Sequence, residues 1–586
     1  GARLAFLATG GGEPAVGVMQ VAGRQVLDRL ALGERRLVGL DWADDDRLLV
    51  TTYENEWLPG GSAGLRAYMR LQIYDVRTRR LVPFRTDRAA GPRDAVGQRP
   101  VVRRTAEGLR VYVRGPAGGL HLVSLDTGVG REIENADDGG QYFLDAGGRV
   151  AAVASLDPVA RAWRVLIRRP GAADLVRRGD SAVDLLVVHG FDAAGAALIV
   201  SEEGADARQF RTLSLADGAL GAPLALPDEP VSFLGERLTG RAYARHFPLS
   251  VRYEFADAAR QQRWDATARA FGNRPLRLVS NTDDFSSAVV RVEDPQRGPE
   301  FYLVDFATGQ GARVGAMFDG LPPLAPVRAY EYAATDGLPI SAALTLPRGR
   351  EWARLPLVVL VDPRPAVPQA YDPWSQALAA EGYAVLRPNR RGTDVSSRLR
   401  RAGHGELGGR MQSDLADGVR RLVQDGLVDP ARVCIAGRGY GGYAAAASVT
   451  LESGTYRCAI ALGGFYDLAA HLDHVTSRVG WGAGFEVRQE ERLLGLGGRN
   501  DPRAAVLSPA RHAAKASAPV LLLHAAQDTW SPPAQARGFA DALRGAGRAV
   551  ELVELPAEDQ RLQRPESMAT VVRESLRFLR AHNPAE

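Results

Sequence analysis

Residues 432–448 read RVCIAGRGYGGYAAAAS, and this stretch decides the fold of the C-terminal half of the chain. Its apolar start is typical of a buried strand, and its run of small residues is typical of a helix. Between them, Gly437-Arg438-Gly439-Tyr440-Gly441 has the spacing of a nucleophile elbow, in which a strand turns sharply into a helix and presents a serine at the central position. The central residue here is Gly439, which has no side chain to attack a carbonyl carbon.

Strand-like runs alternate with helical runs on both sides of this turn. The strand-like runs are VRAYEYAA, ISAALTLP, LPLVVLV, YAVLRPN, RVCIAG, CAIAL, PVLLLH and VELVELP, and helices are expected over 413–426 and 565–582. Eight strands with interposed helices predict a doubly wound α/β sheet. The proline-rich join GLPPLAP (320–326) marks the start of this domain, which we place at 323–586.

Residues 1–322 are rich in short strand-like runs separated by Gly, Asp and Asn turns. A weak motif of alternating apolar residues and a turn recurs at LQIYDVRT (71–78), HLVSLDTG (121–128), RTLSLADG (211–218) and FYLVDFATG (301–309). Each is interpreted as the outer hairpin of a four-stranded unit, and LVGLDWADDDRLLVTTYE (38–55) adds a strand–turn–strand pattern. Spacings of roughly 45 residues, or multiples of that, predict a β-propeller of about seven blades. The alternative is a generic β-sandwich array.

The residues around the elbow resemble the prolyl oligopeptidase family of serine peptidases, and within it the bacterial acylaminoacyl-peptidase and dipeptidyl-peptidase-like branch. That branch typically reads G-G-S-Y-G-G-Y where this chain reads GRGYGGY. Four further segments resemble the family: DGLPISAALTLPRG (336–349), RPNRRGTDVSSRLRRAGHGELGG (387–409), DLADGVRRLVQDGLVDPARVCIAG (414–437) and LLLHAAQDTWSPPAQA (521–536). The resemblance is close over 328–586. It implies a propeller that caps an α/β-hydrolase domain, with the active site between the two.

The resemblance places the three catalytic positions of the family at Gly439, Asp528 and Gln560. Asp528 retains the acid, whereas AEDQRLQRPES (557–567) has Gln560 where the family has histidine. A glutamine amide does not titrate in the working range, so it cannot replace a base whose pKa lies at about 6.5. His524 is close to Asp528 in sequence but lies on the preceding strand.

The resemblance also indicates an altered oxyanion hole. The family reads H-G-G-P after the third strand of this domain, and this chain reads Asp362-Pro363-Arg364-Pro365. Proline has no backbone N–H, and Asp362 would repel a developing oxyanion. The backbone N–H of Tyr440 is left as the other donor. Loss of the nucleophile or its base costs about 10⁶ in rate, and loss of one oxyanion donor costs about 10²–10³.

We therefore interpret the chain as a catalytically inactive relative that acts as a peptide- or protein-binding or regulatory scaffold. The ligand would enter the cleft between the domains. Four arginines lie on segments that converge on this cleft in the family and are candidates for an anion or carboxylate site: Arg364, Arg390, Arg391 and Arg438. Association with a second copy, or with an active paralogue, is a related expectation.

The alternative is an active serine hydrolase that cleaves short peptides with a non-standard nucleophile. Ser396 and Ser531 lie near the motifs in sequence, but neither occupies an elbow. His471 and His474 flank Asp473 in a predicted helix, where an ordinary polar face is the simpler interpretation than a metal site. We expect no metal and no cofactor.

Composition limits the partners and the compartment. The formal net charge is +4, Lys515 is the only lysine among 73 basic residues, and 69 acidic residues are interspersed. This usage is typical of a GC-rich bacterial genome, and without a basic block we expect no nucleic-acid partner. No apolar run is long enough to predict a membrane span. A soluble protein is expected, either periplasmic with its signal peptide removed or cytoplasmic.

Cys434 and Cys458 lie in apolar runs and are interpreted as buried free thiols.

Overall fold

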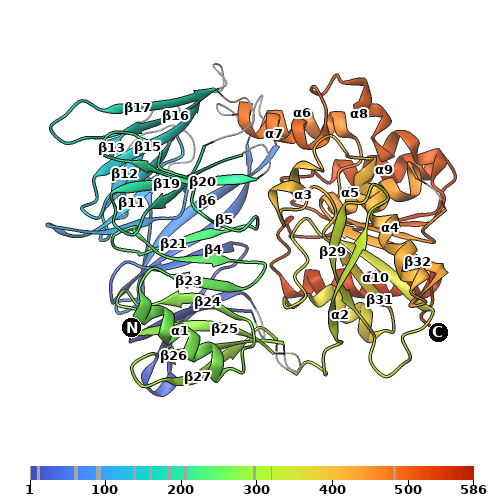
Figure 1. Ribbon diagram of the computed structural model, residues 1–586, viewed down its shortest axis with the longest axis horizontal. Coiled ribbons are helices and arrows are strands. Elements are labelled where there is room, and N and C mark those ends of the chain that lie inside the picture. Colours follow the sequence, from blue (N-terminus) through green and yellow to red (C-terminus); the bar gives the residue numbers. More distant parts are fainter. Residues whose placement is uncertain are drawn as a thin grey trace.

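The computed structural model of the chain describes residues 2–586 apart from 10–12, 59–63, 87–93, 136–139, 158–161, 181–185, 204–206, 295–297, 319, 453 and 480–482. Two parts lie side by side (Figure 1), one built from small sheets and one built around a single large sheet with helices on it. In the part of the chain that is described, no helix is both long enough and apolar enough to cross a bilayer.

Strands β1 to β27 form seven small sheets within the described residues, and their pairing is antiparallel except for a short parallel contact between β13 and β8. The strands are β1 (Arg3–Ala8), β2 (Ala15–Gln20), β3 (Val26–Ala31), β4 (Arg36–Trp42), β5 (Arg47–Leu58), β6 (Gly64–Asp75), β7 (Arg80–Pro83), β8 (Arg85–Thr86), β9 (Ala95–Val96), β10 (Val101–Thr105), β11 (Gly108–Arg114), β12 (Leu120–Val123), β13 (Val129–Glu134), β14 (Gln141–Leu144), β15 (Val150–Asp157), β16 (Ala162–Ile167), β17 (Leu175–Asp180), β18 (Val187–Phe191), β19 (Ala197–Glu203), β20 (Arg208–Ser214), β21 (Ser232–Gly235), β22 (Ala242–Phe247), β23 (Arg252–Phe255), β24 (Leu276–Asn281), β25 (Ser287–Asp294), β26 (Gly298–Asp305) and β27 (Gln310–Ala316).

Alternation along the strands explains why these segments fold as blades. In β16, Trp163, Val165 and Ile167 are buried and the residues between them are partly exposed, because successive side chains of a strand point to opposite faces. Three of the recurring turn motifs connect the third and fourth strands of their sheets, at β6–β7, β12–β13 and β26–β27. Helix α1 (Ala258–Ala270) is not predicted by the turn-rich pattern, because its polar sequence AARQQRWDATARA carries no apolar stripe.

The C-terminal part is built on an eight-stranded sheet in the order β28-β29-β31-β30-β32-β33-β34-β35. Strands β28 and β29 pair antiparallel, β29 pairs antiparallel with β31, and all other neighbours are parallel. The predicted boundary at 322/323 lies in the connection from β27 to β28. The elements are β28 (Val327–Ala333), β29 (Pro339–Thr345), β30 (Leu355–Val361), α2 (Pro373–Ala380), β31 (Ala384–Pro388), α3 (Ser397–Arg401), α4 (Arg410–Gln424), β32 (Val428–Arg438), α5 (Tyr440–Thr450), β33 (Ala459–Leu462), α6 (Leu468–Val479), α7 (Ala483–Leu494), α8 (Pro502–Val506), η2 (Pro509–Lys515), β34 (Val520–Ala525), α9 (Ala534–Gly545), β35 (Val550–Leu555) and α10 (Pro565–His582).

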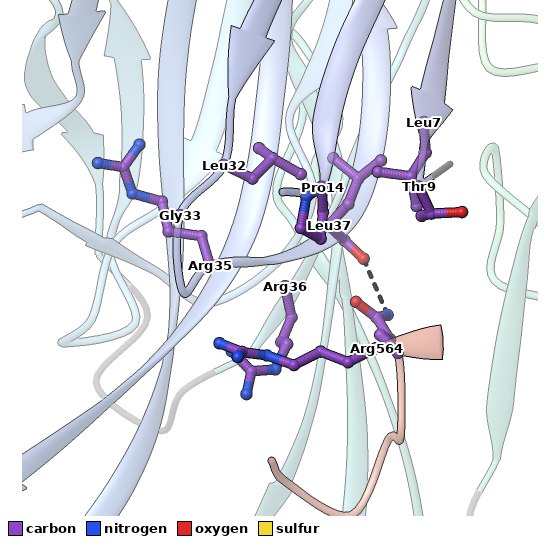
Figure 2. Close-up of a pocket in the computed structure, with 10 residues that line it drawn as sticks. Leu7, Thr9, Pro14, Leu32, Gly33, Arg35, Arg36, Leu37 and Arg564 are labelled. Atoms are coloured by element: carbon purple, nitrogen blue, oxygen red, sulfur yellow. Dashed lines mark hydrogen bonds between the residues drawn. The ribbon is translucent and has the colours of Figure 1, made fainter. Parts of the chain in front are cut away.

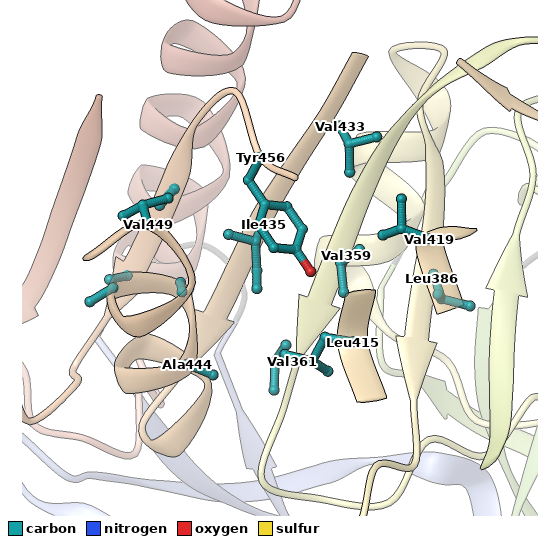
Figure 3. Packing of buried hydrophobic residues seen from close by; sticks show 14 of the residues in the cluster. Val359, Val361, Leu386, Leu415, Val419, Val433, Ile435, Ala444, Val449 and Tyr456 are labelled. Carbon is teal, nitrogen blue, oxygen red and sulfur yellow. The ribbon is translucent and has the colours of Figure 1, made fainter. Parts of the chain in front are cut away.

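Helices cover both faces of this sheet, so its central strands are apolar along their whole length. On one face Val359 and Val361 of β30 pack with α4 and α5 (Figure 3), and residues of α9 belong to the same buried cluster. On the other face Val358 and Leu360 pack with α2 and α10. The sequence prediction of a propeller followed by a doubly wound α/β domain is confirmed.

The interpretation of Cys434 and Cys458 as free thiols is wrong. Cys434 lies on β32 and Cys458 directly precedes the neighbouring parallel strand β33; their Cα atoms are 4.8 Å apart, and they form a disulfide. This separation is within the range that a disulfide spans. The pairing follows from the strand order, which the local sequence around each cysteine does not contain.

Candidate active site

The elbow is formed where β32 ends at Arg438 and α5 begins at Tyr440. Gly439 between them has φ 57° and ψ −116°, a conformation that strongly favours glycine. A Cβ atom on Gly441 would overlap the carbonyl oxygen of Val361, so this flanking glycine is required by space. A Cβ atom on Gly439 would meet nothing within 4 Å. The central position therefore has room for a side chain and carries none.

Asp528 follows β34 and is almost completely buried, with 4% of its surface exposed. Its Oδ1 accepts hydrogen bonds from the backbone N–H groups of Trp530 and Ser531, each at 2.8 Å. Burial raises the pKa of the Asp528 carboxyl to about 7, and these two hydrogen bonds only partly oppose the rise. The acid retained from the family pattern is therefore a buried carboxyl that titrates near neutral pH instead of near its usual pKa of 3.8.

Gln560 lies in the loop between β35 and α10, and Thr529 engages both ends of its side-chain amide. Gln560 Oε1 accepts from the backbone N–H of Thr529 at 3.2 Å, and Gln560 Nε2 donates to Thr529 Oγ1 at 3.2 Å. The backbone carbonyl oxygen of Gln560 accepts from Arg438 Nη2 at 2.5 Å. These contacts join the loop to the residue after Asp528 and to the residue before Gly439. The three positions therefore meet at one edge of the sheet, because the parallel strands β32, β34 and β35 all end there.

A charged pair follows β30 at the same edge. Asp362 accepts from the backbone N–H of Arg364 at 2.9 Å and from its guanidinium at 2.9 and 3.0 Å. Burial raises the pKa of Asp362, but its bonds to Arg364 outweigh burial and the net effect is a lowered pKa. An ionised carboxylate thus stands where the family resemblance places an oxyanion-hole donor. Arg438 is close enough that Asp362 and Arg364 both act on its pKa, which burial lowers.

The four arginines named from the sequence do not form one site. Arg391 is 3% exposed, and its guanidinium donates to Asp414 and to Asp336, so both ends are paired. Arg390 is also buried; it donates to the carbonyl oxygen of Arg391 and lies 3.6 Å from the ring centre of Tyr440. The side chains of these two arginines are therefore engaged by contacts within the α/β domain. Only Arg364 and Arg438 remain as candidates for contact with an anion.

The other residues considered from the sequence have local partners. Ser531 Oγ donates to the carbonyl oxygen of Gly464 at 2.7 Å, and Ser396 Oγ caps the N-terminus of α3. His524 is fully buried, and its Nε2 lies 2.7 Å from the carbonyl oxygen of Ser531. None of these contacts leaves a serine hydroxyl beside a histidine at the elbow.

The two α6 histidines are likewise engaged. His471 Nε2 lies 2.9 Å from Glu490 Oε1, and His474 Nε2 lies 2.9 Å from the carbonyl oxygen of Thr529. In the described residues, no group of three or more His, Cys, Asp or Glu side chains is arranged to hold a metal ion.

The propeller contacts this edge of the sheet through β5. Asn55 Nδ2 lies 3.4 Å from the carbonyl oxygen of Gln527, and the Arg561 guanidinium lies 3.8 Å from the ring centre of Tyr53. Sequence reasoning missed these residues and Thr529. Thr529 had one available signal, its position directly after Asp528, whereas a propeller residue can be assigned to the site only from tertiary structure.

Comparison with known proteins agrees with this geometry. A sequence model of the prolyl oligopeptidase family matches residues 370–584. This match covers most of the α/β domain and none of the propeller. Dipeptidyl aminopeptidase BIII of Pseudoxanthomonas mexicana is 29% identical over 320 residues, which cover 51% of this chain and 45% of that protein. The matches cover less than half the length of each curated relative.

Solved structures extend the likeness from residues 370–584 to the whole fold. The puromycin-hydrolyzing peptidase of Mycobacterium tuberculosis has a TM-score of 0.71 at 18% identity, covering 100% of this chain and 94% of that one. The acylaminoacyl peptidase of Pyrococcus horikoshii has a TM-score of 0.61 at 15% identity, covering 100% and 88%. Both support the fold of a propeller joined to an α/β-hydrolase domain.

Proposed function

We propose that the chain is a non-catalytic member of the prolyl oligopeptidase family that binds peptide or protein ligands at the edge between its two domains. The observation that carries this proposal is Gly439. It occupies the central position of the elbow, where the family chemistry needs a hydroxyl, and it has no side chain. Removal of such a nucleophile typically costs about 10⁶ in rate.

Two further features support an inactive site. Gln560, at the position that the resemblance assigns to the base, is bonded to Thr529 at both ends of its amide and has no titratable nitrogen. Asp362 places negative charge beside the region that would have to stabilise an oxyanion. The first feature acts against proton transfer from the nucleophile, and the second acts against stabilisation of the oxyanion.

The alternative is an active serine hydrolase, and the names of the relatives favour it, since they include a dipeptidyl aminopeptidase. The two functions are separated by turnover of short chromogenic peptides with free and with blocked N-termini. We expect no turnover above that of an Asp528→Asn control purified in parallel. Turnover that the Asp528→Asn variant loses would overturn the proposal, because it would make Asp528 part of a working site.

The ligand we propose carries a carboxylate. Arg438 and Arg364 supply the cationic groups at the edge, and the Arg364 side chain is 68% exposed. A guanidinium pairs with a carboxylate through two parallel hydrogen bonds, so one acidic side chain or a free C-terminus suits this pair.

Fluorescence anisotropy with a glutamate-containing peptide and its glutamine counterpart tests this. A charge-assisted hydrogen bond contributes about 1.5–3 kcal/mol, so Arg438→Ala is expected to weaken binding of the acidic peptide about 10- to 100-fold. Arg544→Ala is the matched control, since Arg544 is exposed on α9 and pairs with Asp541. Equal affinity in the two variants, or equal affinity for the two peptides, would contradict the ligand assignment.

A further inference from the structure

The loop between β35 and α10, residues 556–564, contacts the propeller through one buried arginine. Arg36, the first residue of β4, is 6% exposed. Its Nη2 donates to the carbonyl oxygen of Ala557 at 2.6 Å, and its Nε lies 3.5 Å from Glu558 Oε1 and 4.0 Å from Asp559 Oδ2. A single propeller side chain therefore contacts three consecutive residues of the loop.

The two carboxylates that Arg36 faces organise the loop itself. Glu558 and Asp559 are both fully buried. Glu558 Oε2 accepts from the backbone N–H of Arg564 at 3.1 Å, and Asp559 accepts from the backbone and the guanidinium of Arg561 at 2.8 and 2.7 Å. Asp559 is thus neutralised by a cation of its own loop. In the described part of the chain, the ion pair recorded for Glu558 is the one with Arg36, across the domain boundary.

Weaker contacts surround this ion pair. Gln563 Nε2 donates to the carbonyl oxygen of Leu37 at 3.2 Å, and Figure 2 shows this bond beside Arg36 and Arg564 in the small pocket at the contact. The Arg561 guanidinium lies over the ring of Tyr53. The contact is therefore made of charges, hydrogen bonds and one ring face. Polar contacts between domains are typical of surfaces that separate and rejoin.

The same loop holds Arg438 in place. The carbonyl oxygen of Gln560 accepts from Arg438 Nη2, and Gln560 lies one residue beyond the carboxylates that Arg36 contacts. We propose that Arg36 is a positioning residue, a latch from the propeller that fixes the loop 556–564 and through it the Arg438 guanidinium at the elbow. When the domains separate at this contact, the Gln560 carbonyl moves with the loop and Arg438 loses its acceptor. The consequence for ligand affinity rests on the proposed function; the latch itself does not.

Hydrogen exchange by mass spectrometry on the full chain without ligand tests the latch. Breaking a buried ion pair by removal of one partner leaves an uncompensated charge, so Arg36→Met should increase the exchange rate of amides in 557–564 about 100-fold or more. Arg561 and Arg564 donate their backbone N–H groups to the two buried carboxylates, so their amides report directly on the loop. Arg35→Met is the matched control, because Arg35 pairs with Glu54 and Gln72 inside the propeller. Arg35→Met should leave the exchange rates of the amides in 557–564 unchanged.

Two further variants separate positioning from a general loss of structure. Arg36→Lys keeps the charge and should restore much of the protection that Arg36→Met removes, while amides of α5 stay protected in both variants. Glu558→Gln removes the charge of the other partner in the ion pair and should also speed amide exchange in the loop. Combined with Arg36→Met it should add little, because the two residues share one interaction.

Loop exchange unchanged by Arg36→Met, or changed equally by Arg35→Met, would overturn the proposal. Additive effects of Arg36→Met and Glu558→Gln would also overturn it. Peptide affinity is then measured separately on the same variants. If Arg36→Met speeds loop exchange but leaves peptide affinity unchanged, the proposed ligand site is contradicted, whereas the role of Arg36 in holding the loop is not.

Discussion

Replacement of Asp528 by asparagine should change how the stability of the chain depends on pH. Burial raises the pKa of the Asp528 carboxyl from its ordinary value of 3.8 to about 7. The folded chain therefore holds this proton more tightly than the unfolded chain. It follows that the free energy of unfolding falls as pH rises from about 4 to about 7, and that the loss is complete above this range.

The size of the effect follows from the two pKa values. One pKa unit corresponds to about 1.4 kcal/mol, so the difference between 3.8 and about 7 is worth about 4 kcal/mol in total. Between pH 5 and pH 8 the part still to be lost is about 2–3 kcal/mol. Asparagine keeps an oxygen that can accept from Trp530 and Ser531 and carries no charge at either pH.

Urea unfolding followed by tryptophan fluorescence at pH 5, 6, 7 and 8 measures this difference. The substituted chain should be the more stable one at pH 8, and its advantage over the unsubstituted chain should shrink by about 2–3 kcal/mol at pH 5. Other titrating groups cancel in the comparison. A constant difference between the two chains across this range, or a difference that grows toward low pH, would refute the reasoning that burial raises the pKa of Asp528.

Three further substitutions test the elbow and the ion pairs of Arg391. Gly439→Ala should lower the free energy of unfolding by only about 1–3 kcal/mol, since strain at its positive φ is the sole cost. Gly441→Ala should lower it considerably more, because its Cβ would overlap the carbonyl oxygen of Val361. Equal melting temperatures for these two variants would contradict this difference. Arg391→Met should destabilise the chain by about 3–5 kcal/mol in thermal unfolding, because it leaves Asp414 buried without its cation; a change within about 0.5 kcal/mol would argue against that role.

Much of the fold is readable from the sequence, because local periodicity carries it. The apolar runs around 355–361 and 432–436 predict strands buried on both faces, and the strand–turn–helix spacing of the elbow predicts its geometry. The disulfide is different in kind. Cys434 and Cys458 become neighbours only when β32 and β33 pair, and neither apolar run indicates which strand lies beside it.

The candidate site divides in the same way. Gly439, Asp528 and Gln560 were located from motifs, and the structure brings their segments to one edge of the sheet through Arg438 and Thr529. The roles of the four arginines could not be predicted, because residue type alone does not distinguish a guanidinium paired with two carboxylates from one that can contact a ligand. Burial and partner geometry make that distinction, and both depend on tertiary packing.

Whether the elbow carries a reactive hydroxyl is measured most directly by the intact mass of the purified chain after incubation with an excess of a fluorophosphonate probe. A working serine hydrolase has an activated hydroxyl that attacks the phosphorus and displaces fluoride, which leaves a stable covalent adduct. With glycine at position 439, we expect an unchanged mass. A stoichiometric adduct on the native chain, absent after unfolding, would contradict it.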